Sequence, residues 1–414
     1  MPTVRSRIDV VLSDVDSTRT AREELYVWFH QHPELSMQEH ETSARIAAEL
    51  RGYGVDEVVP IGGTGMAAII RNGEGPVVAM RADFDALPVR EAPVAPYSAT
   101  DRVVTDERTG QESPAGHACA HDVHTTSLLS ATQALARHRR AWAGTFLAVF
   151  QPAEETAEGA RDLVRGGIAE KLPKPDVYLG QHVFGVIPGG SVGTRPGPMM
   201  AAAASIEVTI HGAGSHGSMP YLGVDPIVIA ASVIMRLQTI VSRELNAFDA
   251  AVVTVGSIHG GSKSNIIPDD VVLQLNTRAF GEGVEAKLHE AIERIVTKEC
   301  EAAGAPKPPE FRYYDRFPFT RNDAASTEQV RAAFDEYFEA DAVDMEPLAG
   351  SEDFSIVPNA FGAPYVYWAL GGFADHEHAP GNHSPNFVPD LQPTLDRGME
   401  AIIVAVSPWL MREQ

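Results

Sequence analysis

The sequence predicts an α/β fold: a mixed-sheet α/β domain with helices on both faces, and an inserted ferredoxin-like α+β domain. Its 414 residues are too many for one compact core, so two domains are expected. Apolar strand segments alternate with helical segments in the first half, which favours an α/β layer structure. After a Gly- and Pro-rich stretch the order of elements becomes β-α-β-β-α-β, the ferredoxin-like arrangement.

Strand and helix signals alternate through the first part of the chain. A helical spacing of apolar residues runs over 21–53, and a second helix is expected over 124–136. Buried strands are expected at residues 76–82, 144–150 and 177–179. Polar residues follow each strand: Asp83 and Asp85, then Gln151 to Glu155, then His182. Because ligands of open α/β sheets bind outside the carboxyl ends of the strands, these residues predict a site.

The inserted domain is expected to occupy residues 195–312, so that 1–194 and 313–414 form the first, discontinuous domain, which carries the polar residues at the strand ends. The stretch 187–200 is dense in Gly and Pro and predicts a hinge. The elements expected after it are a strand at 206–210, a helix at 225–245, strands at 252–258 and 271–280, a helix at 284–303 and a strand at 311–314. Pro226 falls in the first turn of its helix, which is a favoured place for proline.

Composition argues against several classes of partner. The formal net charge is −23 with acidic residues spread along the chain, which argues against nucleic acid and anionic lipid. The sequence has two cysteines, Cys119 and Cys300, so a reducing compartment is expected. No secretory signal is visible, and the apolar run 227–235 is shorter than the roughly 20 residues that span a bilayer. We therefore expect a cytoplasmic protein without nucleic-acid or membrane partners.

Cys119 and His121 are the first candidates for metal binding, because thiolate and imidazole bind divalent transition metals. The alternative is a buried cysteine beside Asp122, which would cap a helix starting near His124. Glu154 and Glu155 follow a buried strand, so one could bind a metal while the other transfers protons. A solvated acidic turn is the alternative there.

His182 and His383 are weak candidates when each is taken alone, because a single histidine is more often a satisfied polar residue. Together with Cys119, His121 and the glutamate pair, however, they favour a two-metal site. The segment Gly63 to Ala68 formally fits a dinucleotide-binding fingerprint, but that fingerprint requires a following helix. A strand and the turn signal Asn72-Gly73 follow instead, so a Rossmann dehydrogenase is set aside.

Three residues of the inserted domain are candidates for contacting a substrate. His216 stands between glycines on a turn after a strand, where backbone and ligand can approach closely, although a simple hairpin explains it equally. Asn265 in a loop and Arg278 in a strand could bind a carboxylate through paired hydrogen bonds. A surface ion pair is the alternative for Arg278.

Taken together, these residues resemble the M20 family of metallopeptidases, in the branch of hippurate hydrolases and indole-3-acetyl-amino-acid hydrolases. The likeness covers nearly the whole chain. The segments that carry it are His30 with His32 to Leu35, Gly62 to Gly65, Met80 to Pro88, His117 to Asp122, Gln151 to Glu155, Gly214 to Gly217, Val224 to Ile227, Ser351 to Phe354 and His383 to Phe387. Ala120, Val123 and Tyr221 depart from the usual Gly, Gly and His. Alanine at position 120 requires a negative φ or some strain.

The resemblance implies two divalent metal ions, zinc or manganese, with cobalt or nickel as alternatives. Cys119 would bridge them, His121 and His182 would hold one, and Glu155 and His383 the other. Glu154 would act as general base and then as acid, and Asp85 would orient a ligand. The smaller domain would be a lid and dimerisation domain in a homodimer. There His216 would reach a neighbouring subunit's carbonyl, while Asn265 and Arg278 would hold the substrate carboxylate.

The implied activity is hydrolysis of the amide bond of N-acyl amino acids, small molecules that yield a carboxylic acid and a free amino acid. Three other functions stay open: a dipeptidase, a thiol-dependent amide hydrolase that uses Cys119, and a non-catalytic metal-dependent binding protein. The presence of Glu154 beside a complete ligand set argues against the last, because a binding site needs no base. The acyl group and the amino acid are not determined by these motifs.

Overall fold

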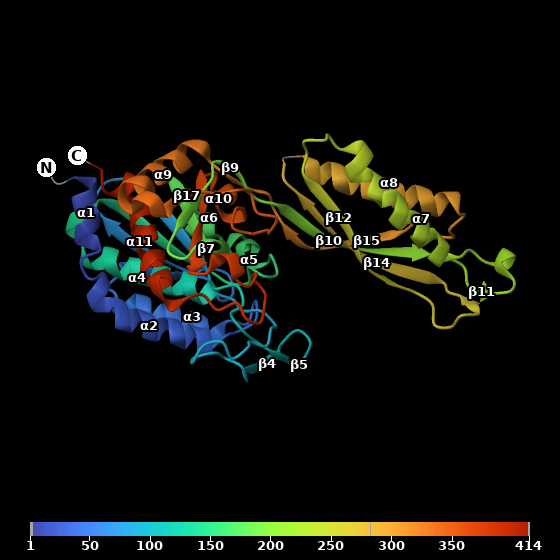
Figure 1. The fold of residues 1–414 in the computed structure, drawn as a ribbon, viewed down its shortest axis with the longest axis horizontal. Helices are drawn as coiled ribbons and strands as arrows, with labels where there is room; N and C mark the ends of the chain where they lie inside the picture. Colours follow the sequence, from blue (N-terminus) through green and yellow to red (C-terminus); the bar gives the residue numbers. More distant parts are fainter. Residues whose placement is uncertain (1–2, 282, 413–414) are drawn as a thin grey trace. The chain divides into compact units, whose positions relative to one another are not determined.

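Figure 1 shows the computed structural model of the chain, which describes residues 3–281 and 283–412. These residues form two compact units. Unit 1 contains the residues up to Met199, Arg321–Glu346 and those from Asp353 onward, and unit 2 contains Met200–Thr320 and Pro347–Glu352. Unit 2 therefore ends after the expected boundary at residue 312. A boundary there would cut the last strand, which stays paired as far as Phe317.

A mixed sheet forms the centre of unit 1. Its order is β1 (Glu57–Pro60), β2 (Met66–Asn72), β6 (Gly144–Gln151), β3 (Val77–Asp83), β7 (Val177–Pro188), β18 (Tyr365–Phe373), β8 (Val192–Thr194) and β17 (Ala342–Asp344). The strands β6, β3, β7 and β18 run parallel to one another. Their carboxyl ends therefore meet at one edge of the sheet.

Helices cover both faces of this sheet, as the sequence predicts. The helices of unit 1 are α1 (Val4–Val11), α2 (Val15–Gln31), α3 (His40–Gly52), α4 (His121–Arg137), α5 (Gly159–Arg165), α6 (Ile168–Lys171), α9 (Ala324–Phe338), α10 (Ile356–Phe361) and α11 (Leu391–Leu410). Val78 and Met80 of β3 belong to the core that α2, α4 and α11 share, and Ala79 between them is equally buried. Because neighbouring side chains of a strand point to opposite faces, both faces are covered. The α/β fold class is confirmed.

Two short strand pairs lie outside the large sheet of unit 1. The strand β4 (Val103–Asp106) pairs with β5 (Gln111–Pro114), and β9 (Gly197–Met200) pairs with β16 (Thr320–Asn322).

Unit 2 has the order β-α-β-β-α-β that the sequence predicts. Its elements are β10 (Ala202–His211), α7 (Pro226–Thr239), β12 (Ala251–His259), β14 (Asp270–Ala279), α8 (Val284–Ala302) and β15 (Glu310–Phe317), with the short strands β11 (Ser215–His216) and β13 (Ile266–Ile267). The main sheet is antiparallel with the order β12-β14-β10-β15. Both helices contribute to one core with this sheet, which is ferredoxin-like packing.

Two element boundaries near the predicted site differ from expectation. The helix α4 begins at His121 rather than near His124, so Asp122 lies inside its first turn and does not cap it. The strand β7 continues to Pro188, so His182 lies within a strand and not after it. The reason is β18, whose Ala369 and Leu370 pair with His182 and Val183. A partner strand that comes from the far end of the chain leaves no local signal at residue 182.

The helical stretch Pro226–Glu244 is longer than the apolar run 227–235 considered above. Among the described residues it is the one helix long and apolar enough to cross a membrane, by length and composition alone. One side of it, with Ile229, Val233 and Leu237, is packed into the core of unit 2. Its most apolar 18-residue window is 33% buried, and one such helix is weak evidence of a membrane span.

Candidate metal centre

The five predicted metal ligands meet at one place in unit 1. Cys119 Sγ lies 3.5 Å from His182 Nε2, and His121 Nε2 lies 3.7 Å from Glu155 Oε1. His383 Nε2 lies 3.3 Å from the other Glu155 oxygen. Ligand atoms of Cys119, His121 and Glu155 all lie within 4.8 Å of one another. Five side chains from four separate segments of the sequence therefore surround one small volume.

The sheet and one loop explain this convergence. Glu155 follows β6 and His182 lies in β7, on either side of β3, while His121 is the first residue of α4. His383 comes from the loop after β18, where its backbone N–H donates to the Ala118 carbonyl at 2.7 Å. That hydrogen bond holds the histidine loop against the residues just before Cys119.

Strained backbone accompanies the site. Ala120, Ala153 and His383 have φ angles of 62°, 48° and 70°, in the left-handed region that side chains with a Cβ avoid. Such a conformation costs roughly 1–2 kcal/mol per residue. The sequence left two alternatives for Ala120, a negative φ or a strained backbone. Its φ is positive, so the backbone is strained. Residues in such conformations persist where the surroundings determine them, which is common at functional sites.

The Asp85 carboxylate contacts several parts of the centre. Its Oδ1 lies 3.1 Å from His121 Nδ1 and accepts the backbone N–H of Glu154 at 3.0 Å. Its Oδ2 accepts the backbone N–H of Glu155 at 3.1 Å and the Ser36 hydroxyl at 2.7 Å. Because Nδ1 of His121 is held by the carboxylate and the backbone carbonyl of Asp85, its Nε2 is the ring nitrogen that faces Glu155. Asp85 is thus placed where it can orient a ligand.

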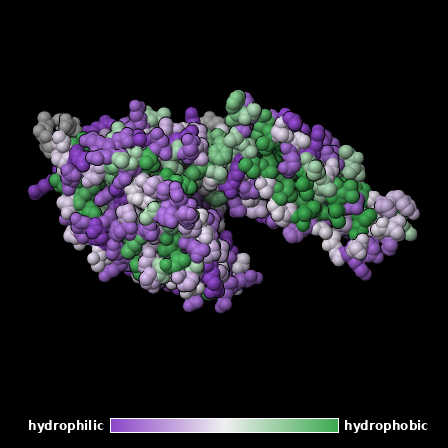
Figure 2. Space-filling view, in the orientation of Figure 1, coloured by the Kyte–Doolittle hydropathy of each residue, from purple (hydrophilic) through white to green (hydrophobic). Residues whose placement is uncertain are grey.

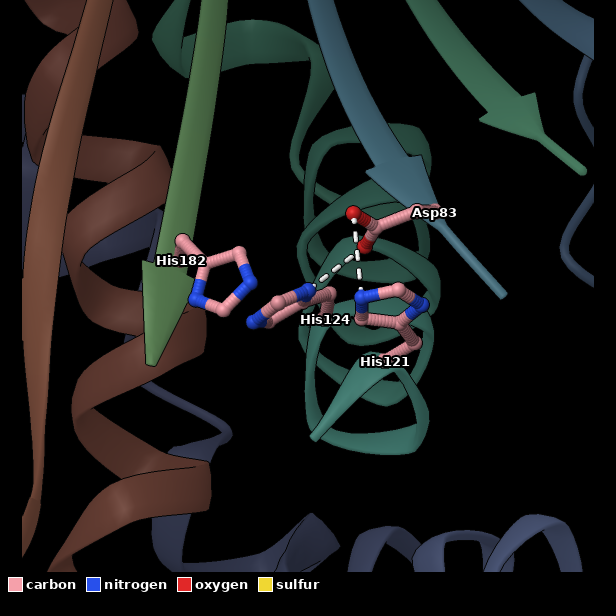
Figure 3. Close-up of side chains that lie close together, drawn as sticks. All are labelled: Asp83, His121, His124 and His182. Atoms are coloured by element: carbon pink, nitrogen blue, oxygen red, sulfur yellow. Dashed lines mark hydrogen bonds and ion pairs between the residues drawn. The ribbon is translucent and has the colours of Figure 1, made fainter. Parts of the chain in front are cut away.

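His124 and Asp83 also belong to this cluster, and neither was assigned a role from the sequence. Figure 3 shows His121 and His124 on α4, with Asp83 at the end of β3 and His182 on β7. His124 Nδ1 lies 2.5 Å from Asp83 Oδ1, and His124 Nε2 accepts the backbone N–H of Val183 at 2.9 Å. Both ring nitrogens are therefore occupied, so His124 supports the strand beside His182. Its spacing of three residues from His121 on one helix face was the available signal.

The electrostatics of the histidines follow from their neighbours. Burial, and then the neighbouring His124 ring, holds the pKa of His182 well below its usual value. Its Nδ1 donates to the Val183 carbonyl at 2.8 Å, which leaves the Nε2 lone pair facing Cys119. Hydrogen bonds to Cys119 and then Glu155 raise the pKa of His383 to about 10. At neutral pH the centre thus combines a neutral His182 ring with a protonated His383 ring beside Glu155.

The side chains present fit a divalent transition metal. Among the described residues, His121 Nε2 and Glu155 Oε1 are buried atoms without a hydrogen-bond partner, although they face each other. Buried polar atoms are normally satisfied, so such a pair indicates a missing ligand. Sulfur, nitrogen and oxygen donors together suit zinc and its neighbours among the divalent ions. Cys119, His121 and His182 are buried, Glu155 is partly buried, and His383 is exposed.

The residues predicted to contact substrate lie in unit 2. His216 is exposed on β11, and its Nδ1 accepts the Ser218 hydroxyl at 2.8 Å. Asn265 lies in the turn directly before β13, and its backbone carbonyl accepts the Gly217 N–H at 2.9 Å. Arg278 is near the other end of β14, where its Nε donates to Asn276 Oδ1 at 3.1 Å and it also contacts Ser351.

Within unit 2, Asn265 and Arg278 do not come together. Residue 265 precedes the start of β14 at Asp270, and the strand from there to Arg278 is roughly 26 Å long at about 3.3 Å per residue. One chain therefore cannot use both side chains of this unit on the same carboxylate. The expectation that they act as a pair holds only if they come from different subunits.

Residues 79–403 match the family model described as peptidase family M20/M25/M40. The chain belongs to the M20 peptidase family. It is 34% identical to IAA-amino acid hydrolase ILR1-like 4 of Arabidopsis thaliana over 93% of this chain and 87% of that protein. It is 35% identical to N-acetyl-L-cysteine deacetylase of Bacillus subtilis over 84% of this chain and 80% of the relative. The family resemblance inferred from the sequence is confirmed.

A solved structure of this M20 family extends the agreement to the fold. The YxeP protein of Bacillus subtilis, described as a dinuclear metal-binding peptidase, superposes with a TM-score of 0.77 at 26% identity. The match covers 95% of this chain and 98% of that one. The chain is therefore an M20 hydrolase whose predicted ligands cluster in unit 1.

Proposed function

We propose that this M20 hydrolase cleaves the amide bond of N-acyl amino acids with the help of two divalent metal ions. The observation that carries the proposal is the convergence of Cys119, His121, Glu155, His182 and His383 beside a buried second glutamate. The relatives named as an IAA-amino acid hydrolase and an N-acetyl-L-cysteine deacetylase support an N-acyl amino acid as substrate. Zinc and manganese are the proposed ions.

The metal ligands are proposed as the resemblance assigns them, with Cys119 common to both ions. Bound there, divalent ions would lower the pKa of a water molecule and polarise the acyl carbonyl. Glu154 is the proposed proton carrier: it takes a proton from the attacking water and returns it to the leaving amine. It suits this task because it is only 5% exposed and its backbone N–H is held by Asp85.

His216 is proposed to stabilise the oxyanion from a neighbouring subunit. Because its Nδ1 accepts from Ser218, a neutral ring carries its proton on Nε2, which can donate to a carbonyl oxygen. Asn265 directly precedes β13, which pairs with the His216 strand β11, and would act with His216, whereas Arg278 near the other end of β14 would serve a different site. A homodimer through unit 2 provides this arrangement.

An apolar surface on unit 2 supports the proposed dimer. Ile227, Val228 and Met235 of α7 are 42%, 65% and 73% exposed, and Figure 2 shows hydrophobic residues gathered over this part of unit 2. The strand β12 lies at the edge of the sheet with Val252 and Ile258 exposed, and an unpaired edge can pair with a second copy. A cytoplasmic location stays a prediction from composition.

A thiol-dependent hydrolase is the second candidate, because Cys119 Sγ lies 3.5 Å from His182 Nε2. In that mechanism the histidine would take the thiol proton and the sulfur would attack the carbonyl. The two candidates differ in what inactivates them. A thiol enzyme keeps its activity under chelation, whereas the metal-dependent enzyme loses it.

The test uses the full-length protein, stripped with a chelator and reloaded with Zn²⁺, Mn²⁺, Co²⁺ or Ni²⁺. Each form is incubated with N-acetyl, N-benzoyl and indoleacetyl amino acids and with dipeptides, and the products are identified by mass spectrometry. We expect metal-dependent release of a carboxylic acid and a free amino acid. Activity that survives chelation and ends on alkylation would favour the thiol mechanism. Turnover of dipeptides alone would indicate a dipeptidase, and metal binding without any turnover a binding protein.

A further inference from the structure

The carboxylate of Glu39 is fully buried at the start of α3, yet it does not cap its own helix. The first amides of α3 are satisfied by another carboxylate: Glu34 accepts the backbone N–H groups of Glu41 at 3.0 Å and Thr42 at 2.8 Å. Glu39 is therefore available for contacts outside the helix.

These contacts join three segments that are remote in the sequence. Oε1 of Glu39 accepts the backbone N–H groups of Met37 and Ala153, both at 2.9 Å. Its Oε2 accepts the Thr64 hydroxyl at 2.8 Å. Thr64 belongs to the Gly62 to Gly65 turn, and Ala153 immediately precedes the glutamate pair of the metal centre. The mechanism proposed above uses neither Glu39 nor this turn.

We name residues 152–155 the catalytic turn. Its three consecutive amides at Ala153, Glu154 and Glu155 all donate to buried carboxylates, the first to Glu39 and the other two to Asp85. Ala153 has a φ of 48°, a conformation that a residue with a Cβ keeps only when its surroundings determine it. Glu39 contacts the amide of this strained residue.

Close packing holds the other side of the catalytic turn. A Cβ atom at Gly159 would lie 1.5 Å from the Pro152 carbonyl oxygen, so the start of α5 presses directly on the turn. The Gly159 N–H also donates to the Ala153 carbonyl at 3.0 Å. The turn is therefore held between α5 on one side and the two carboxylates on the other.

We propose that Glu39 is a positioning residue that holds the catalytic turn in the geometry required for proton transfer and metal binding. The inference rests on the proposed function of Glu154 and Glu155. It requires that Glu39 act through hydrogen-bond geometry and not through its charge, because its partners are backbone N–H groups and a hydroxyl. Glu39 thus positions Glu154 and Glu155 indirectly, through its hydrogen bond to the backbone of Ala153.

Glutamine is a close substitute at this position. Burial, and then the negative charge of Asp85, raises the pKa of Glu39 to about 8. A side-chain amide keeps the oxygen that accepts the two N–H groups, while its NH₂ can donate to a rotated Thr64 hydroxyl. Aspartate keeps the charge but shortens the reach to Ala153. Alanine leaves the buried donors without an acceptor.

The test compares E39Q, E39D and E39A with the control variant E34A in the full-length protein. Zinc affinity, kcat and KM for an N-acyl amino acid, and the thermal midpoint are measured for each. We expect E39Q to stay within about twofold of the wild type, and E39A to lose about 10–100-fold in kcat and in zinc affinity, as for other supporting residues of metal sites. E39D should fall between them. E34A should lose thermal stability but keep kcat and zinc affinity.

Two outcomes would overturn the inference. In the first, E39A and E39D lose thermal stability as E34A does but keep kcat and zinc affinity, which shows a purely structural role. In the second, E39Q is as impaired as E39A, which shows that the charge matters and not the geometry. If E39A does not fold, E39D and E39Q still decide between these outcomes. Zinc affinity also separates this inference from the proposed function, because it is measured even if no N-acyl amino acid is hydrolysed.

Discussion

The metal centre of unit 1 and the paired strands β11 and β13 of unit 2, which present His216, differ in how far their polar side chains are buried and held by neighbours. In unit 1 the donors are mostly buried, and His121 and His182 each have their second ring nitrogen engaged by a neighbour. In unit 2 the His216 side chain is exposed, and Ser218 two residues away contacts its ring. Pre-organised groups in a buried site act without reorganisation, whereas an exposed group needs a partner surface to exclude water.

This difference separates two requirements of the proposed activity. All five proposed metal ligands lie in unit 1, so changes in unit 2 should leave the metal content unaltered. Turnover should need both units, because the proposed oxyanion donor comes from unit 2. The predictions below test this separation, beginning with the largest expected effect.

Replacing the central thiolate should remove metal and activity together. In Cys119→Ala we expect metal content, measured by elemental analysis, and turnover to fall to the level of the chelated wild type, because the sulfur is proposed to contact both ions. Cys300→Ala, which changes the buried cysteine of unit 2, is the matched control and should keep its metal. A metal-replete Cys119→Ala protein would remove the sulfur from the ligand set.

Replacing the proposed base should remove turnover alone. In Glu154→Gln we expect kcat to fall about 10²–10⁴-fold, the usual contribution of a general acid–base group, with metal content unchanged. Glu158→Gln, an exposed neighbour that pairs with Arg165, is the control. Near-normal kcat in Glu154→Gln would contradict the assigned role.

Replacing His216 of unit 2 should lower turnover without changing the metal content. In His216→Ala we expect kcat to fall about 10²–10³-fold, the typical effect of losing one oxyanion donor. His211→Ala, which breaks an exposed ion pair with Glu310 in the same unit, should be nearly silent. Mixing His216→Ala chains with Glu154→Gln chains should restore part of the activity if His216 acts on a neighbouring subunit. No restoration after subunit exchange would place it in its own site or outside catalysis.

The smallest effect concerns stability and arises from His30. Its Nδ1 lies 2.7 Å from Asp122 and its Nε2 2.8 Å from Glu91. Burial by itself lowers the pKa of His30, but the two carboxylates outweigh it and raise the pKa to about 9 from 6.5. The folded state therefore binds this proton more tightly than the unfolded state, so the stabilisation is complete below pH 6.5 and is lost as the pH rises through about 9.

Denaturant unfolding across this window measures the effect. The His30 contribution to the free energy of unfolding should decline by about 3 kcal/mol between the two pH values, and His30→Gln should lack that part of the slope. His40→Gln, at an exposed position of α3, is the control. Equal slopes in the wild type and His30→Gln would show that the pair of carboxylates does not stabilise the charged ring.

Much of the site was predictable because the residue types that bind metal ions can be identified in the sequence. Cys119, His121, the Glu154–Glu155 pair, His182 and His383 were recognisable as metal donors following strands or in loops, and the family resemblance selected Glu155 as the ligand. The structure brings these residues together. His182 was expected after a short strand, but its strand is longer because β18 pairs beside it. Such pairing across the sheet has no local signal.

The supporting residues were harder to predict for the same reason. The contact of Glu39 with Ala153 spans 114 positions in the sequence, and that of His124 with Asp83 spans 41. Asn265 and Arg278 illustrate a limit of the opposite kind: their chemistry suits one carboxylate, yet they lie near opposite ends of β14, so one chain cannot use both on the same group. Residue type indicates what a side chain can bind, and the fold decides which partners it meets.

The sequence by itself determined the α/β class, the M20 family and the five donors, because apolar periodicity and ligand chemistry are properties of short segments. Tertiary structure alone decided that Ala120 and Ala153 adopt left-handed backbone, and that two buried carboxylates hold the catalytic turn. Those features depend on hydrogen bonds between segments far apart in the chain, and such bonds form only once the sheet has brought its strands together.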